Sequence, residues 1–205
     1  MKPIVYIDGK EGTTGLQIYD RIGARDDITL LLIDEDKRKD PVERQKLMNA
    51  ADLVFLCLPD AAAREAVTLV TNPATRIIDA STAHRTSPGW DYGFAELSPR
   101  HRAAIQASRR VANPGCHASG FIAIVYPLVA CGLLPPDALL SCHSITGYSG
   151  GGKKMIAQYE APDRPAELDS PRQYGLSQTH KHLPEMQKLC GFAYAPIFFH
   201  RGGFL

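Results

Sequence analysis

Four short apolar segments alternate with helical patterns in the first 80 residues. The apolar segments lie at 4–7, 28–33, 53–58 and 76–80. The helix signals between them include Asp40-Pro41, an N-cap residue followed by proline at the first helical position, and Asp60, the predicted cap of a helix that extends to Val70. Strands this uniformly apolar suit a parallel sheet that is covered on both faces. The pattern therefore predicts an α/β protein that begins with a Rossmann-type doubly wound parallel sheet.

A glycine-rich segment follows the first predicted strand. It contains Gly9, Gly12, Thr13, Thr14 and Gly15. In a doubly wound sheet, this strand-to-helix turn holds the pyrophosphate of a dinucleotide, and the threonine hydroxyls can donate to a phosphate. The spacing is GxxGxxG instead of the usual GxGxxG, so a simple glycine-rich turn is the alternative. The position of the segment favours cofactor binding by these five residues.

A basic cluster follows the second predicted strand, where the adenosine ribose of such a cofactor lies. Lys37, Arg38 and Lys39 come directly after the acidic residues Asp34 to Asp36. An acidic residue at this position favours NAD, whereas basic residues favour NADP. A clamp of Lys37 and Arg38 on the 2′-phosphate and a solvated charge run are both compatible with the sequence.

Cys116 is the candidate nucleophile of the chain. Pro114 and Gly115 form a predicted turn after a strand at 110–112, and an apolar helical pattern extends from 121 to 131. The thiol therefore lies at or near a helix N-terminus, where free amides and the helix dipole favour thiolate. The same amides can receive an oxyanion during acyl transfer through a thioester. The alternative is that Cys116 is a small buried apolar residue.

Further candidate residues follow other predicted strands. Arg85 can hold a phosphate or carboxylate through two bonds, and its alternative is an ordinary surface arginine; the neighbouring His84 is expected to be structural. Ser149, Gly150 and Lys153 lie in a serine- and glycine-rich loop that can bind an oxyanion, although a surface turn has a similar composition.

Two histidines, His180 and His182, come just before a proline-started helix. Either can serve as the acid/base partner of Cys116, because histidine titrates near neutral pH. No cysteine or third histidine lies at ligand spacing, so we expect no metal. A chance surface pair is the alternative.

The composition restricts the classes of partner and the cellular compartment. In 205 residues, 23 Lys and Arg nearly balance 22 Asp and Glu, so no global charge favours nucleic acid or an anionic membrane. The five cysteines include no CxxC pair, which favours free thiols in a reducing cytosol. No signal peptide or bilayer-length apolar run is recognisable, so we expect a cytoplasmic protein.

Taken in order, these motifs resemble the shorter class of the N-acetyl-gamma-glutamyl-phosphate reductase family, which is related to aspartate-semialdehyde dehydrogenase. The resemblance extends from Lys2 to about Phe198. It implies an NADP-binding domain at 1–112 and a catalytic domain at 113–205, with Asn113 orienting the nicotinamide. It also implies that Cys116 is acylated by a small-molecule acyl phosphate, with one of the two histidines as acid/base.

Members of this family continue beyond the position of Leu205, so the resemblance implies an incomplete sheet in the second domain. Unpaired strand edges should favour association, and we expect a homo-oligomer. Two alternatives remain at the level of the sequence. One is aspartate-semialdehyde dehydrogenase, which shares the chemistry, and the other is a cofactor-binding fragment without catalysis.

Overall fold

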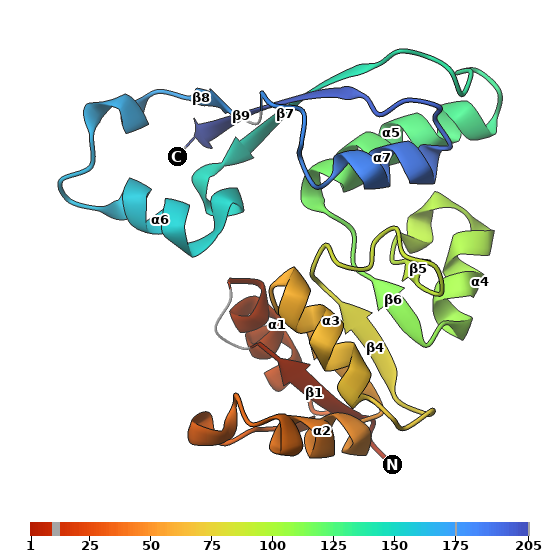
Figure 1. The fold of residues 1–205 in the computed structure, drawn as a ribbon, viewed down its shortest axis with the longest axis vertical. Coiled ribbons are helices and arrows are strands. Elements are labelled where there is room, and N and C mark those ends of the chain that lie inside the picture. Colours follow the sequence, from red (N-terminus) through yellow and green to blue (C-terminus); the bar gives the residue numbers. More distant parts are fainter. Residues whose placement is uncertain (10–12, 175, 205) are drawn as a thin grey trace. The chain divides into compact units, whose positions relative to one another are not determined.

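The computed structural model describes residues 1–9, 13–174 and 176–204 and divides into two compact units, Met1–Pro114 and Gly115–Leu205 (Figure 1). The sequence placed the boundary between residues 112 and 113. Gly12 lies outside the described residues, and for Thr13, Thr14 and Gly15 only the backbone is described.

The first unit contains a six-stranded sheet in the order β2-β1-β3-β4-β6-β5. Every pair of neighbouring strands is parallel, which confirms the predicted doubly wound sheet. The strands are β1 (Ile4–Asp8), β2 (Thr29–Leu31), β3 (Leu53–Leu56), β4 (Arg76–Asp79), β5 (Asp91–Tyr92) and β6 (Arg110–Ala112).

Among the described residues of this unit, four α-helices accompany the sheet, and α1 and α2 both contact β1. The helices are α1 (Thr13–Gly23), α2 (Pro41–Ala50), α3 (Asp60–Leu69) and α4 (Pro99–Ala107), with short 3₁₀ helices η1 (Glu35–Lys37) and η2 (Ala95–Leu97). The predicted cap of α2 is confirmed, because Asp40 accepts a hydrogen bond from the Val42 amide at 2.9 Å. Side chains of β1, β3 and β4 form the core with α2 and α3, including Tyr6, Met48, Val54, Leu56 and Ile77.

Two local predictions for the first unit were wrong. The second strand was expected at 28–33, but β2 covers only Thr29–Leu31 and Leu32 is exposed. β2 is an edge strand, so it has a hydrogen-bonding partner on one side only. Asp60 was expected to cap α3, but it is the first helical residue, and its carboxylate accepts from the Thr82 amide at 3.0 Å.

The strand order reverses beside β1, which lies between β2 and β3. The carboxyl ends of β1 and β3 therefore form the switch point where doubly wound sheets bind ligands. Gly9 follows β1 directly and has φ +94°, and a Cβ built on it would lie 2.3 Å from the Cys57 carbonyl oxygen after β3. A glycine with this backbone conformation, just before α1, fits the turn that a dinucleotide phosphate requires.

The second unit contains a three-stranded sheet in the order β7-β9-β8. β7 (Ser141–Gly147) is parallel to β9 (Ile197–Phe204), and β8 (Arg172–Tyr174) is antiparallel to β9. The helices α5 (Cys116–Ala130) and α7 (Leu183–Cys190) lie side by side (Figure 1). The 3₁₀ helix η3 (Tyr148–Gly151), α6 (Gly152–Glu160) and the 3₁₀ helix η4 (Ala166–Asp169) connect β7 to β8. Within the described ranges, no helix combines the length and apolarity that a membrane crossing needs.

Candidate active site

Cys116 is the first residue of α5, and its side chain is exposed. Gly115 is the N-cap residue, with extended backbone angles, and its carbonyl accepts from the Ser119 amide at 2.8 Å. The predicted position of the thiol at a helix N-terminus is therefore confirmed. Helix geometry leaves the first amides of α5 without intrahelical acceptors, so they can receive an oxyanion that forms beside the sulfur.

The remaining cysteines differ from Cys116 in burial or in their position relative to a helix. Burial raises the pKa of Cys57 and of Cys190 to about 11, and it also raises the pKa of Cys142. Cys131 is exposed like Cys116 but is the C-cap residue of the same helix. The helix dipole favours a thiolate at the N-terminus and disfavours it at the C-terminus.

We therefore expect Cys116 to be the fastest-alkylated cysteine of the folded chain. With iodoacetamide at pH 7.5, it should react roughly fivefold faster than Cys131, which is the control because it is also exposed but lies at the opposite end of the same helix. Cys57 and Cys190 should react more slowly than both. Peptide mass spectrometry over a time course measures each rate. A Cys131 rate equal to or above the Cys116 rate would contradict the role assigned to the helix terminus.

Four histidines of the second unit form a cluster, and three of them surround the fully buried ring of Phe198. Ring centroids lie 4.6 Å apart for His180 and His182, 4.6 Å for His180 and His200, and 5.3 Å for His117 and His200. Phe198 lies within 5.4 Å of three of these rings. The sequence identified only His180 and His182, because the other members come from α5 and β9 and meet them only in the fold. In the described part of the chain, no group of His, Cys, Asp and Glu side chains has a geometry that could hold a metal ion.

The two histidines that the sequence left as alternatives have different environments. Burial, followed by the charges of His200 and His117, lowers the pKa of His180 to about 4. Its Nδ1 accepts from the His182 backbone amide at 3.2 Å. His182 is buried, and its Nε2 lies 3.8 Å from a carboxylate oxygen of Glu185.

Glu185 is a site residue that the sequence interpretation missed. It lies in the first turn of α7, is 1% exposed, and accepts a hydrogen bond from the Gly115 amide at 3.1 Å. One carboxylate therefore contacts both the residue before Cys116 and the imidazole of His182. The available signal was an acidic residue in the first turn of a helix that directly follows the histidine pair.

The histidine cluster should make the second unit sensitive to acid. Burial lowers the pKa of His117 and His200 as well as that of His180. Below pH 6.5, these histidines therefore bind more protons in the unfolded chain than in the folded chain. The free energy of unfolding should therefore fall as pH drops from 6.5 toward 4. Thermal unfolding followed by circular dichroism at pH 7.5 and pH 5 measures the loss.

Replacing one member of the cluster should reduce this acid sensitivity. His180→Gln should lose less thermal stability than the wild type between the two pH values. His143→Gln is the control, because His143 is exposed on β7, and it should lose as much as the wild type. Equal losses in all three proteins would show that the cluster does not couple to unfolding.

In the first unit, a polar network follows β4. Asp79 is fully buried and accepts from the Ser81 amide and hydroxyl at 2.9 and 2.7 Å. Its carboxylate also lies 2.6 Å from Nδ1 of His84, which stacks on Trp90 at 4.1 Å. The structural role predicted for His84 is confirmed. Arg85 donates from Nε to the Asn113 carbonyl at 2.8 Å, so its guanidinium braces the chain after β6, and its anion-binding role stays a prediction.

The basic cluster after β2 makes ion pairs within its own segment. Lys37 lies 3.1 Å from the Asp34 carboxylate, and Arg38 lies 2.7 Å from that of Glu35. All four side chains are more than one third exposed. Exposed pairs of this kind contribute little to stability, so both cations can exchange these carboxylates for a phosphate.

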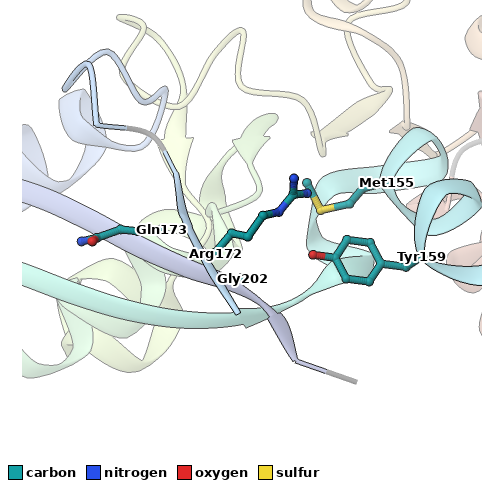
Figure 2. A pocket seen from close by; sticks show the side chains of 5 residues that line it. All are labelled: Met155, Tyr159, Arg172, Gln173 and Gly202. Atoms are coloured by element: carbon teal, nitrogen blue, oxygen red, sulfur yellow. The ribbon is translucent and has the colours of Figure 1, made fainter. Parts of the chain in front are cut away.

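The loop after β7 places its predicted residues in η3 and at the start of α6. Gly150 packs closely, because a Cβ on it would lie 2.7 Å from the Thr146 hydroxyl, while Ser149 and Lys153 are exposed. A nearby cavity of about 230 Å³ is lined by other residues, namely Met155, Tyr159, Arg172, Gln173 and Gly202. Figure 2 shows Arg172 extending toward Met155 and Tyr159. The Arg172 guanidinium lies 6.0 Å from the Tyr159 ring centroid.

Each of the two units contains a segment that matches a known protein family. Residues 10–105 match the NAD binding domain of semialdehyde dehydrogenase, and residues 116–199 match the semialdehyde dehydrogenase dimerisation domain. Two solved structures share the fold at low identity. Aspartate semialdehyde dehydrogenase II from Vibrio cholerae has a TM-score of 0.66 at 14% identity, covering 98% of this chain and 70% of that one. Aspartate semialdehyde dehydrogenase with NADP from Candida albicans has a TM-score of 0.64 at 11% identity, and the match covers 98% of this chain and 68% of that one.

Curated relatives are much more similar in sequence. N-acetyl-gamma-glutamyl-phosphate reductase 2 of Pseudomonas putida is 50% identical over 196 residues, which are 96% of this chain and 62% of the relative. N-acetyl-gamma-glutamyl-phosphate reductase of Chelativorans sp. is 52% identical over 193 residues, 94% of this chain and 62% of the relative. The chain thus spans less than two thirds of these relatives. It belongs to the semialdehyde dehydrogenase family and shares about half of its matched residues with members named N-acetyl-gamma-glutamyl-phosphate reductase.

Proposed function

We propose that the chain carries the catalytic machinery for the NADPH-dependent reduction of N-acetyl-L-glutamyl 5-phosphate, a step in arginine biosynthesis. The products are N-acetyl-L-glutamate 5-semialdehyde and phosphate. The observation that carries the proposal is the exposed thiol of Cys116 at the start of α5. The amide of the preceding residue, Gly115, donates a hydrogen bond to the Glu185 carboxylate, which in turn contacts His182. The names of the relatives support the choice of substrate.

The reaction begins at Cys116. Its thiolate attacks the acyl carbon, and the bond from that carbon to the phosphate oxygen breaks. Phosphate departs, and the acyl group remains bound to the sulfur as a thioester. The amides at the start of α5 receive the oxyanion of this step. NADPH, when bound, supplies the hydride that reduces the thioester. His182 donates a proton to the resulting hemithioacetal oxyanion and recovers it when the carbon–sulfur bond breaks to release the aldehyde.

The environments of the two histidines favour His182 as the acid/base. His180, with a pKa of about 4, is neutral at physiological pH and uses Nδ1 to accept the His182 amide. His182 faces the Glu185 carboxylate, which stabilises the protonated imidazole. We therefore assign His180 to orienting the segment and His182 to proton transfer.

The remaining predicted residues take binding roles in this proposal. Gly9 and the residues at the start of α1 would hold the cofactor phosphates, Lys37 and Arg38 the 2′-phosphate, and Asn113 the nicotinamide. Arg85 and the loop residues Ser149, Gly150 and Lys153 would hold the phosphate or carboxylate of the substrate. The match to a dimerisation domain supports a homo-oligomer, and we place the protein in the cytoplasm.

Preference for NADPH should depend on the cluster after β2. Replacing Lys37, Arg38 and Lys39 by alanine should weaken NADPH binding roughly tenfold more than NADH binding, because only NADPH carries the 2′-phosphate. Lys46→Ala is the control, because Lys46 is an exposed lysine on α2 paired with Glu43. Calorimetry with both cofactors measures the affinities. Equal losses for the two cofactors would identify the cluster as a solvated charge run.

A substrate assay tests the proposed function. NADPH oxidation by residues 1–205 should depend on N-acetyl-L-glutamyl 5-phosphate and should not occur with aspartyl phosphate. Turnover of aspartyl phosphate instead would assign the chain to the related semialdehyde dehydrogenase reaction. Tight NADPH binding with no turnover of either acyl phosphate would contradict catalysis by this chain.

A further inference from the structure

A buried ion pair lies at the carboxyl end of β1, directly before the turn proposed to hold the cofactor phosphates. Asp8 is the last residue of β1 and is 4% exposed, and Arg44 in α2 is 8% exposed. The guanidinium donates from Nη2 to Oδ2 at 2.8 Å and from Nε to Oδ1 at 3.4 Å. Both oxygens of the carboxylate therefore face α2.

The backbone of Asp8 is fixed at the switch point of the sheet. Its carbonyl accepts from the Cys57 amide at 2.8 Å, and the next residue is Gly9, where a Cβ would meet the Cys57 carbonyl. The turn that begins at Gly9 is where a doubly wound sheet holds the pyrophosphate of a dinucleotide. The Asp8 carboxylate thus lies within one residue of the place where we expect an anion.

The described groups around Asp8 include one cation, Arg44. The Tyr6 hydroxyl lies 3.5 Å from Oδ1, and burial, followed by the Asp8 charge, raises the pKa of Tyr6, which therefore stays neutral. From β3, Cys57 is neutral too, because burial raises its pKa to about 11. From α3, Glu65 lies 3.7 Å from Nη1 of Arg44, but its side chain is 63% exposed. The other charges that act on Tyr6 or Cys57 are Glu43 and Asp79.

Stability alone does not explain why this place holds an ion pair. Replacing a buried ion pair by apolar residues of similar volume is often neutral or stabilising, because the two charges lose their hydration in the pair. The surroundings would accept such residues, since Met48, one turn further along α2, and Leu56, opposite Asp8 on β3, are both completely buried. A bare carboxylate here would repel a phosphate, whereas the pair carries no net charge.

We infer that Arg44 is a positioning residue of the cofactor site that acts through Asp8: it holds the carboxylate against α2 and cancels its charge, so that the turn after β1 accepts a pyrophosphate. This inference rests on the proposed function, in which NADPH binds at this turn. Arg44 does not touch the cofactor in this assignment. Its role differs from that of the cluster after β2, because NADPH and NADH share the pyrophosphate, so its loss should weaken both equally.

Three variants give the end of β1 different charges. Arg44→Met keeps an unbranched side chain but leaves the Asp8 carboxylate uncancelled, which makes the place negative. Asp8→Asn keeps the shape and leaves the guanidinium, which makes the place positive. The double variant, with both substitutions, is neutral like the wild type. Cofactor affinity should therefore follow the charge and not the number of contacts that are lost.

Calorimetry with NADP⁺ and NAD⁺ at pH 7.5 measures this order. Arg44→Met should bind both cofactors about tenfold more weakly than the wild type, because the carboxylate repels the pyrophosphate. Asp8→Asn should bind them about threefold more tightly than the wild type, and the double variant should stay within about twofold of it. A pair that only ties α2 to β1 would instead weaken binding in both single variants, because each one breaks the same contact.

The pH dependence isolates the charge of Asp8. A buried carboxylate without its cation takes up a proton more readily, so the deficit of Arg44→Met relative to the wild type should shrink from about tenfold at pH 7.5 to about threefold or less at pH 5.5. The ratio to the wild type removes the titration of the 2′-phosphate itself. Arg25→Met is the matched control, because Arg25 forms an exposed pair with Asp27 beyond the end of α1. It should change neither affinity nor pH dependence.

Circular dichroism shows which variants fold. If Arg44→Met does not fold, Asp8→Asn should still bind NADP⁺ about threefold more tightly than the double variant. Weaker binding by Asp8→Asn than by the wild type, or equal affinities of Asp8→Asn and the double variant, would overturn the inference. If the affinities follow the charge but no acyl phosphate is reduced, the proposed reaction fails and the role of Arg44 stands. A wild type without affinity for NADP⁺ would overturn both.

Discussion

Cys116→Ser should lower the rate of acyl phosphate reduction by on the order of 10⁴-fold or more while NADPH affinity stays unchanged. Serine replaces the sulfur at the start of α5 by a hydroxyl, which is a much weaker nucleophile near neutral pH. The residues proposed to hold the cofactor belong to the first unit, whereas Cys116 belongs to the second. Steady-state kinetics and calorimetry measure the two quantities.

Cys131→Ser is the control for this substitution. Cys131 is also exposed and belongs to the same helix, but it lies at the opposite end from the candidate site. Its replacement should leave kcat and KM within about twofold of the wild type, as is usual for surface substitutions. A Cys116→Ser variant with more than a tenth of the wild-type rate would refute nucleophilic catalysis by this thiol.

Gly9→Ala should destabilise the first unit by about 3 kcal/mol or more. Its φ of +94° is a conformation that residues with a Cβ rarely adopt, and the new Cβ would lie 2.3 Å from the Cys57 carbonyl oxygen. The backbone between β1 and β3 would have to move. Urea unfolding followed by the fluorescence of Trp90 measures the effect, because Trp90 is the single tryptophan of the chain and lies in the first unit.

Gly89→Ala separates the two causes of this loss. Gly89 has φ +76°, but a Cβ there would meet nothing within 4 Å. This substitution should therefore cost only the backbone strain, about 1 kcal/mol. Losses of the same size at Gly9 and Gly89 would show that the close approach of Cys57 does not limit the turn after β1.

Much of the first unit could be predicted because its signals are local. Apolar runs identified the buried strands, and the cap formed by Asp40 identified the start of α2. The length of β2 could not be predicted, because Leu32 is apolar but lies at the edge of the sheet, where pairing is one-sided. Aspartate is a residue type that often caps helices, but the Asp60 carboxylate accepts a hydrogen bond from the amide of Thr82, which is distant in the sequence.

The candidate site was only partly predictable, because some of its contacts join residues that are distant in the sequence. The position of Cys116 at a helix start follows from the turn before it and the apolar pattern after it. The contact between Glu185 and Gly115 joins residues 70 positions apart, and His200 comes from β9, a strand distant in sequence from His117 on α5. Local pattern carries no information on such contacts, so the sequence could not separate His180 from His182.

The covalent state of Cys116 during turnover shows directly whether its sulfur is the nucleophile. The chain is mixed with N-acetyl-L-glutamyl 5-phosphate in the absence of NADPH, quenched in acid, digested and analysed by mass spectrometry. We expect one N-acetylglutamyl group on the peptide that contains Cys116, its loss after NADPH is added, and no such group in Cys116→Ser. An unmodified Cys116 peptide, or an acyl group on another cysteine with Cys116 unmodified, would contradict this expectation.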